Sequence, residues 1–398
     1  MTELAKTDWI DAPATRAVID ALHAVRADCA RFVGGCVRNS IMGRDVDDID
    51  IATQLEPQAV VDALEAAGIR AIPTGIEHGT VTAVIESKPF EITSLRRDVE
   101  TDGRRAVVAF TDDWAEDAGR RDFRLNALYA DASGKIYDPI GGGLEDAEAG
   151  RVIFIGDADE RLREDYLRIL RFYRFNAWYG AGIDAEGQAA CERQKEGLRQ
   201  IAVERIWKEL RKLLTAPDPT QAVLAMEESG VLALLLPECE TLDGLHDLRV
   251  SETLAGVGAD PMLRLMALID RSAPSVMAVS KRLRLSNAEA DRLTMWAADN
   301  LPKIPGMNGV ELRRTLYWHG KQAVVDRALT SGENVRDHLY AIRAWKRPEF
   351  PVGGDDALAA GLKGPQIGEA LRALEEWWMG QDFQPEREEL LARLEKNQ

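Results

Sequence analysis

A glycine pair followed by an alternating acidic segment constrains this chain more than any other feature. Residues 31–53 read RFVGGCVRNSIMGRDVDDIDIAT, with Gly34 and Gly35 directly after an apolar run. The pattern predicts a strand, a tight turn without side chains, a short helix and a second strand over DIDIAT. This strand–turn–helix–strand unit fits a mixed α/β domain.

Asp48 and Asp50 are the chemically informative residues of this unit. Alternate residues of a strand share a face, so the two carboxylates are expected to project together while Ile49 and Ile51 point into a core. Two carboxylates beside a glycine turn that opens a helix suit Mg²⁺ carrying an anionic ligand. The Asp-x-Asp triplet alone is also compatible with a polar strand edge. The glycine pair and Arg38 favour the metal–anion site.

The bulk composition limits the class of protein. A length of 398 residues allows two or more domains, and 45% hydrophobic with 29% charged residues is typical of a soluble globular chain. The N-terminus lacks the basic start and apolar run of a signal peptide, so a cytoplasmic location is expected. The cysteines form no Cys-x-x-Cys pair and fit neither a zinc site nor a disulfide framework. They are Cys29, Cys36, Cys191 and Cys239.

The charge of the chain gives two opposing indications. The formal net charge of −17 argues at first against a nucleic-acid partner. Cationic side chains nevertheless gather at residues 161–174, 205–212 and 281–284. A solvated helix face is the commoner origin of such a run. Because these stretches lie beside the motifs described below, some of them are expected to face a polyanion.

The periodicity of the chain changes near residue 156. Before it, helical and strand-like segments alternate, and the polar segment 98–105 is predicted to be a mobile loop. After it, nearly everything to about residue 345 has helical periodicity, and a last helical segment follows. Short strands of the first part are expected at residues 69–73, 80–86, 90–95 and 106–110.

A second group of chemically suitable residues occurs in RRDFRLNAL, residues 120–128. Arg121, Asp122 and Asn126 together can hold the ribose and phosphates of a bound nucleotide. The alternative is a capped helix with an ordinary Arg–Asp pair.

A third group lies in ERLREDYLRILRFYRF, residues 160–175, which is predicted to be one amphipathic helix. Asp165 and Arg168 are three residues apart and therefore neighbours on one face. Arg171 and Arg174 continue this spacing. The alternative is an exposed ion pair of little energetic value.

These segments resemble those of a known family. In order over residues 31–214 they are GGCVR, DDIDIAT, EHGTVTAV, FEITSLRRDVETDGRR, RRDFRLNAL, DPIGGGLEDAEAGRV, REDYLRILRFYRF and VERIWKELRKLL. This set resembles class II tRNA nucleotidyltransferases, which are the CCA-adding enzymes and the related bacterial poly(A) polymerases. FPVGGDDALAAGLKGPQIGEALRALEEW resembles the tail segment of that family. Two departures are Ala202, where the family usually has Ser, and Asn39, where it often has Asp.

The resemblance implies an α+β fold with a polymerase-β-type nucleotidyltransferase head, followed by an all-helical neck, body and tail. The catalytic head is expected over residues 1–155 and the base-selecting neck over 156–215. The body is expected over 216–345, and a tail that contacts tRNA over 346–398.

The resemblance also implies that Asp48 and Asp50 are catalytic and hold two Mg²⁺ ions. The 3′-hydroxyl of an RNA end attacks the α-phosphorus of a nucleoside triphosphate, and pyrophosphate leaves. A pair of metal ions lowers the pKa of the hydroxyl and stabilises charge on the leaving oxygen. Glu91 is a possible third carboxylate near the metals. Alternatively, it is a strand residue ion-paired with Arg96 or Arg97.

The nucleotide-binding set follows from the same resemblance. Backbone N–H groups at the glycine pair approach the triphosphate, and arginines add charge. The expected residues are Gly34, Gly35, Arg38, Arg121, Asp122, Asn126, Asp165, Arg168, Arg171 and Arg174.

Asp165 and Arg168 acquire a specific expected role, because this family selects its nucleotide with side chains. Cytosine and adenine each present an amine donor beside a ring-nitrogen acceptor, whereas uracil and guanine present the reverse. A carboxylate only accepts and a guanidinium only donates, so the pair complements C and A. Arg171 and Arg174 are expected to support this pair or to contact the triphosphate.

The product is expected to be CCA, made from CTP and ATP on the acceptor end of tRNA. EHGTVTAV, residues 77–84, resembles the CCA-adding type and lacks the basic, aromatic segment of the poly(A) polymerases. The segment 98–105 is expected to help switch selection from C to A. Two alternatives remain: a poly(A) polymerase, and an RNA-binding relative with an inactive head.

Overall fold

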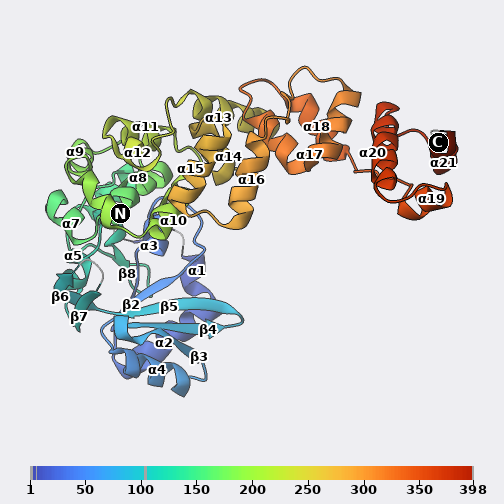
Figure 1. Ribbon diagram of the computed structural model, residues 1–398. Helices are drawn as coiled ribbons and strands as arrows, with labels where there is room; N and C mark the ends of the chain where they lie inside the picture. Colours follow the sequence, from blue (N-terminus) through green and yellow to red (C-terminus); the bar gives the residue numbers. More distant parts are fainter. Residues whose placement is uncertain (1–2, 6, 103–104, 397–398) are drawn as a thin grey trace. The chain divides into compact units, whose positions relative to one another are not determined.

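The computed structural model describes residues 3–5, 7–102 and 105–396. The chain divides into two compact units, Met1–Leu235 and Leu236–Gln398, which are described separately. Figure 1 shows the first unit as a sheet-containing part continued by helices, and the second unit as helices throughout. The described residues include no helix long and apolar enough to cross a bilayer.

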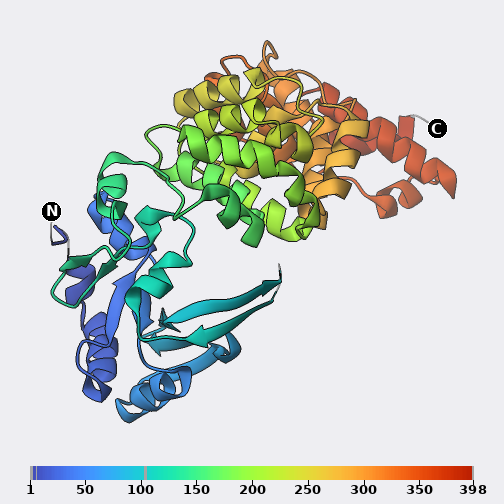
Figure 2. The same ribbon diagram turned by 90° about the vertical axis from the view of Figure 1, so that its left-hand side faces the viewer.

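The first unit contains a seven-stranded mixed sheet in the order β3-β4-β5-β2-β1-β8-β9. Neighbouring strands are antiparallel except β2 and β5, which are parallel. Helices α2 (Pro13–Val25) and α4 (Pro57–Ala66) pack on each other and on the sheet, as Figure 2 also shows. The strands are β1 (Ala30–Val33), β2 (Asp50–Thr53), β3 (Arg70–Gly75), β4 (Thr80–Ile85), β5 (Lys88–Ser94), β8 (Tyr129–Ala130) and β9 (Ile136–Tyr137).

The strand–turn–helix–strand unit is confirmed. β1 ends in a turn at Gly34, whose φ of 70° favours glycine, and α3 (Gly35–Ile41) follows directly. β2 is shorter than expected. It begins at Asp50, so Asp48 lies in the irregular segment just before the strand. Ile49 is buried at the point where the chain enters the sheet.

The prediction of a mobile loop over residues 98–105 is wrong for the described part of that segment. β6 (Arg96–Asp102) and β7 (Arg105–Phe110) form a separate antiparallel two-stranded sheet. Residues 103–104 lie outside the described part of the chain. Polar composition suggested a loop, but an Asp-Gly dipeptide between two segments is a strong hairpin signal. The backbone hydrogen bonds between the two strands stabilise the hairpin although the segment contains few apolar residues.

The helical part of the first unit packs on the head through aromatic rings. Phe123 contacts Phe154 and Phe175 with ring centroids 4.9 and 5.3 Å apart, and Phe154 stacks on Phe172 at 5.4 Å. The remaining helices are α1 (Asp8–Asp11), α5 (Trp114–Gly119), α6 (Gly143–Ala149), α7 (Ala158–Glu164), α8 (Leu167–Tyr179), α9 (Ala185–Gln194), α10 (Val203–Leu214), α11 (Thr220–Glu228) and α12 (Val231–Leu235).

The prediction of one helix over residues 160–175 is wrong, because the helix breaks at Asp165. Asp165 has extended backbone angles, φ −152° and ψ 103°, between α7 and α8. Its Oδ1 accepts a hydrogen bond from the Leu167 N–H at 3.1 Å. A short acidic side chain that bonds the backbone two residues later favours such a break over a continuous helix.

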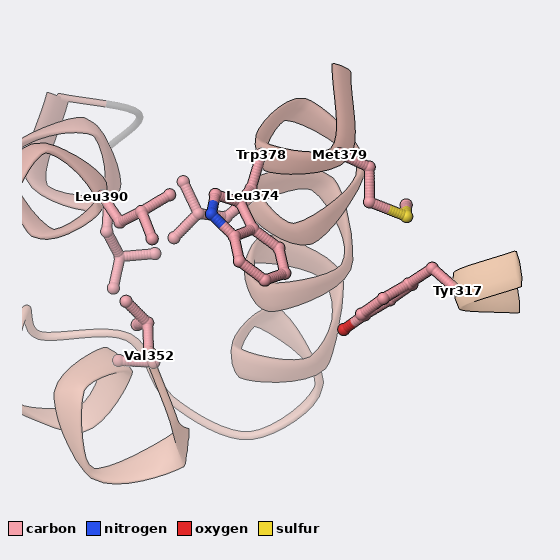
Figure 3. Packing of buried hydrophobic residues seen from close by; sticks show 8 residues of the cluster. Tyr317, Val352, Leu374, Trp378, Met379 and Leu390 are labelled. Carbon is pink, nitrogen blue, oxygen red and sulfur yellow. The ribbon is translucent and has the colours of Figure 1, made fainter. Parts of the chain in front are cut away.

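The second unit is helical in its described residues and ends in a compact tail. Figure 3 shows Trp378 and Leu374 directed toward Leu390 and Val352, with Tyr317 on the other side of the indole. The helices are α13 (Asp243–Ala255), α14 (Pro261–Leu268), α15 (Ala273–Leu283), α16 (Asn287–Ala297), α17 (Gly309–Leu329), α18 (Arg336–Ala344), α19 (Gly354–Ala359), α20 (Pro365–Gly380) and α21 (Arg387–Lys396).

Trp378→Ala is expected to destabilise this tail strongly. The indole is 3% exposed, and its Nε1 donates to the Pro385 carbonyl at 3.1 Å. Removing a buried Trp lowers the free energy of unfolding by about 3–5 kcal/mol. Denaturant unfolding of the full chain measures the loss. Trp318→Ala, at a residue 56% exposed, is the matched control and should change stability by less than about 1 kcal/mol. Equal effects of the two substitutions would contradict the tail core.

Candidate active site

A cavity of about 620 Å³ in the first unit collects most of the expected site residues. It is lined by segments far apart in the sequence, from the β1–α3 turn to α10. The expected residues that line it are Gly34, Gly35, Arg38, Asp50, Arg121, Asp122, Asn126, Asp165, Arg168 and Arg171. The lining also includes Arg96, Arg120, Leu167, Phe175 and Arg205. Asp48, Glu91 and Arg174 do not belong to it.

The glycine turn lies against an arginine. A Cβ placed on Gly34 would lie 3.7 Å from Nη1 of Arg121, so the guanidinium is close to the bare backbone of the turn. Backbone without side chains beside a cationic group is suited to an anionic ligand such as a phosphate.

The carboxylates at the sheet are close enough to influence one another. Asp50 on β2 is the register partner of Glu91 on the parallel strand β5. Burial, together with the negative charges of Glu91 and Asp48, raises the pKa of Asp50 to about 6, although Arg121 and Arg38 oppose the shift. The ion pair that Arg97 forms is with Glu116, at 3.8 Å, and not with Glu91.

This acidic group fits Mg²⁺ better than a metal held entirely by protein. Among the described residues there is no set of three or more His, Cys, Asp or Glu side chains spaced to hold a metal ion. Mg²⁺ is usually bound through one or two carboxylates together with substrate phosphates. Asp50 lines the cavity, and its carboxylate is held near other acidic groups at a cost that a divalent cation would relieve.

A chain of hydrogen bonds crosses the cavity wall from the head to α8. Arg38 is 5% exposed, lies 3.8 Å from the Tyr179 ring centre and donates from Nη1 to Oδ1 of Asn126 at 2.6 Å. The Asn126 amide donates to Oδ1 of Asp122 at 3.2 Å, and Arg171 Nε donates to its Oδ2 at 2.7 Å. Burial acts to raise the pKa of Asp122, but Arg171 and Asn126 outweigh it, so the pKa is lowered. Asp122 is therefore a charged anchor for both neighbours.

A buried carboxylate that the motifs did not indicate organises the arginines of the cavity. Asp117, in the first turn of α5, is 1% exposed and accepts from Arg120 Nη2 at 2.7 Å and from Arg121 Nη2 at 3.0 Å. The Tyr129 hydroxyl donates to it at 2.8 Å. Burial acts to raise the pKa of Asp117, and the two arginines more than reverse that effect.

Asp117→Asn is expected to lower the free energy of unfolding by about 3 kcal/mol, because it leaves buried guanidinium groups without their counter-charge. It should also weaken binding of a nucleoside triphosphate about tenfold, since Arg121 loses its orientation. Denaturant unfolding and calorimetric titration measure the two effects. Tyr129→Phe removes one donor to the same carboxylate but leaves the arginines in place. Tyr129→Phe should therefore affect stability more than nucleotide binding. If Tyr129→Phe weakened nucleotide binding as much as Asp117→Asn does, the role of Asp117 would be contradicted.

Asp165 and Arg168 both line the cavity, and each has a further partner of its own. Oδ2 of Asp165 accepts from Arg205 Nη2 of α10 at 2.8 Å. Arg168 is paired with the Glu164 carboxylate, and its Nη2 donates to the Arg120 carbonyl at 3.1 Å. An acceptor and a donor, each held by a partner, thus line the same cavity.

Two residues differ from expectation in their surroundings. Arg174 lies beside Glu209 of α10, with 2.8 Å between Nε and Oε2, outside the cavity lining. Arg205, which had been noted only within a cationic stretch, reaches Asp165 across 40 positions of sequence. The VERIW segment within the family-like motifs was the available signal for Arg205.

Comparisons with known proteins identify the family of this chain. Residues 30–153 match the family model described as "Poly A polymerase head domain", and residues 182–242 match "Probable RNA and SrmB- binding site of polymerase A". The Mus musculus protein "CCA tRNA nucleotidyltransferase 1, mitochondrial" is 33% identical over 385 residues, which are 92% of this chain and 86% of the mouse protein. This chain belongs to the CCA-adding tRNA nucleotidyltransferase family.

Other members of the family support the assignment along the length of the chain. The CCA-adding enzyme of Geobacillus sp. (strain WCH70) is 32% identical over 87% of this chain and 87% of its own. The crystal structure of the Bacillus stearothermophilus CCA-adding enzyme in complex with CTP superposes with a TM-score of 0.77 at 27% identity, covering 97% and 98% of the two chains. The Thermotoga maritima CCA-adding enzyme complexed with tRNA has the same fold, with a TM-score of 0.71 at 16% identity. The predicted α+β fold with a sheet-containing head is confirmed, and the chain is a nucleotidyltransferase by family.

Proposed function

We propose that this chain adds C, C and A to the 3′ end of tRNA from CTP and ATP, without a nucleic-acid template, and releases pyrophosphate. The observation that carries the proposal is that the glycine turn, Asp50, Asp165 and Arg168 line one cavity. The curated relatives named as CCA-adding enzymes or CCA tRNA nucleotidyltransferases extend over most of the chain, which supports the same reaction.

The chemical step is assigned to Asp50, which lines the cavity, and to its acidic neighbours Asp48 and Glu91. Asp48 and Asp50 would hold two Mg²⁺ ions, with Glu91 as the nearby third carboxylate. When bound, the ions activate the attacking 3′-hydroxyl and stabilise charge on the leaving pyrophosphate. The chain keeps Asp50 and Glu91 on neighbouring strands of one sheet, and Asp48 lies two residues before the strand that carries Asp50.

The triphosphate is assigned to the glycine turn. Gly34 and Gly35 let the phosphates approach the backbone, while Arg38 and Arg121 supply positive charge from two sides. Because Arg38 is held by Asn126 and Arg121 by Asp117, both guanidinium groups are oriented before the nucleotide arrives.

The ribose and the base are assigned to other lining residues of the same cavity. Asp122 and Asn126 lie where a ribose hydroxyl can be bound, with Arg171 fixing Asp122. Asp165 accepts from the exocyclic amine of cytosine or adenine, and Arg168 donates to the adjacent ring nitrogen. Uracil and guanine would place acceptor against acceptor and donor against donor.

The remaining parts are assigned to RNA. We retain a head over residues 1–155, a neck over 156–215, a body over 216–345 and a tail over 346–398. The tail is proposed to contact tRNA.

Incorporation of single nucleotides tests the proposal. Purified protein is incubated with tRNA lacking its 3′ CCA, Mg²⁺ and one labelled nucleotide at a time, and products are resolved by length. Two C and one A, followed by a stop, are expected. Unlimited A addition would contradict the proposal and indicate a poly(A) polymerase. The matching head-domain model carries the name of that activity. No incorporation under any condition would indicate an inactive RNA-binding relative.

A further inference from the structure

The arginines that line the nucleotide cavity differ in how their charge is balanced. Several of them are paired with a carboxylate of the chain, so part of their positive charge is compensated before a ligand binds. These pairs are Arg120 and Arg121 with Asp117, Arg168 with Glu164, Arg171 with Asp122, and Arg205 with Asp165. Arg38, which lines the same cavity, is held in a different way.

Arg38 is a buried cation whose hydrogen-bond partners are neutral. Within the described part of the chain, its guanidinium donates to the side-chain amide oxygens of Asn126 and Asn39. The aromatic ring of Tyr179 covers the guanidinium from one side. Burial is the largest influence on the pKa of Arg38 and lowers it. A guanidinium that is held by neutral amides keeps its full charge for an anionic ligand.

Asn39 orients Arg38 from a position where this chain departs from the pattern of its family. Its Oδ1 accepts from Arg38 Nε at 3.2 Å and from Nη2 at 2.8 Å, and its Nδ2 donates to the Asp45 carbonyl at 3.0 Å. Because a guanidinium only donates, the amide must present its oxygen to Arg38 and its NH₂ group to the carbonyl. An aspartate, which the family often has here, would place a carboxylate on the guanidinium and would lack a donor for the carbonyl.

The contact between Asn39 and Arg38 lies beside the glycine turn. A Cβ placed on Gly35 would lie 3.9 Å from Nη2 of Arg38, and this nitrogen is one of the two that donate to Asn39. The turn is the part of the cavity to which the triphosphate is assigned. A carboxylate at position 39 would therefore add negative charge next to the expected phosphates and repel them, whereas an amide does not.

We infer that Asn39 is a positioning residue that sets the affinity for the triphosphate, because its neutral amide orients Arg38 and leaves the full charge of the guanidinium to the phosphates. This inference rests on the proposed function, since it takes the triphosphate to lie at the glycine turn. The hydrogen bond to the Asp45 carbonyl keeps the amide from turning round, so its oxygen stays directed at Arg38.

Calorimetric titration with CTP and with CMP, without RNA or divalent cations, tests the inference on two variants. Asn39→Asp should weaken binding of CTP about tenfold, because it places a negative charge beside the triphosphate. CMP carries fewer negative charges, so its binding should weaken by no more than about threefold. Asn39→Ala removes the hydrogen bonds to Arg38 without adding charge, and should weaken CTP binding by no more than about threefold. Thermal melting checks that the variants are folded.

Asn287→Asp is the matched control. Asn287 is exposed at the start of α16 and does not line the cavity, so the same change of charge there should leave the affinity for CTP unchanged. Wild-type affinity for CTP in Asn39→Asp, or an equal loss of affinity for CTP and CMP, would overturn the inference. It would also be overturned by an equal loss in Asn39→Ala and Asn39→Asp, since the charge at position 39 would then not be the cause.

These titrations require no turnover, so they separate the inference from the proposed function. A wild-type protein that binds CTP but adds no nucleotide to tRNA would refute the proposed function. The comparison of Asn39→Asp with Asn39→Ala would still decide whether position 39 controls binding of the triphosphate.

Discussion

Asp50→Asn should reduce CTP incorporation by about a thousandfold or more, since it removes a carboxylate from the proposed metal site. The substitution should leave the fold intact. The pKa of Asp50 is raised to about 6, so its ionised form destabilises the metal-free protein, and a neutral side chain removes that penalty above pH 6. Single-turnover incorporation with saturating tRNA and CTP measures the loss. Asp48→Asn should have a comparable effect.

A neighbouring acidic residue provides the control for this experiment. Asp45 is exposed in the same irregular segment and does not line the cavity, so Asp45→Asn should incorporate CTP at the wild-type rate. The Asp50→Asn protein should still bind tRNA, which filter binding checks. Retained turnover in Asp50→Asn or in Asp48→Asn would remove that residue from the catalytic group.

Asp165→Ala combined with Arg168→Ala should relax the choice of base. Against U or G, the wild-type pair would leave buried donors and acceptors mismatched at about 1–3 kcal/mol for each group, and the double variant lacks these groups. The ratio of kcat/KM for CTP to that for UTP should therefore fall by about a hundredfold. Loss of binding to the correct base should lower kcat/KM for CTP as well.

Arg163→Ala is the control for base selection. Arg163 is an exposed arginine near the end of α7 that does not line the cavity, so its removal should leave discrimination unchanged. If the double variant discriminates against UTP and GTP as strongly as the wild type, selection depends on other groups. The pairing of Asp165 with Arg205 makes Arg205 the first residue to test in that case.

Much of the fold was accessible from local pattern. The glycine turn and the change to helices after residue 156 depend on nearest neighbours in sequence, and the structure agrees with them. The second strand of the β6–β7 hairpin was expected at residues 106–110, whereas β6 was missed because backbone pairing stabilises it in a polar segment. The helix break at Asp165 was missed because the apolar period continues through it, while the side chain bonds the Leu167 N–H.

The composition of the cavity could be predicted from the sequence only in part. Its motif residues could be expected together through the family resemblance, and most of them line one space. The contact of Arg205 with Asp165 could not be predicted, because it depends on packing between distant segments. Asp117 pairs with its sequence neighbours Arg120 and Arg121, but the burial that makes it an anchor depends on tertiary packing. Asp117 of α5 accepts a hydrogen bond from Tyr129 of β8, and Arg205 of α10 donates to Asp165 at the α7–α8 junction.

The position of Asp50 on β2 has a consequence for local stability. β2 lies between β1 and β5 inside the seven-stranded sheet, so its backbone amides are bonded on both sides and should exchange with solvent only in rare, near-global openings. Asp165 lies where two helices end, and there the last turns fray readily. Exchange of the backbone amides should therefore be slow around Asp50, which is assigned to the chemical step, and fast around Asp165, which is assigned to the base. Under the proposed function, a rigid reaction centre would then be combined with a more adaptable base-selecting residue, which suits a cavity proposed to take both CTP and ATP.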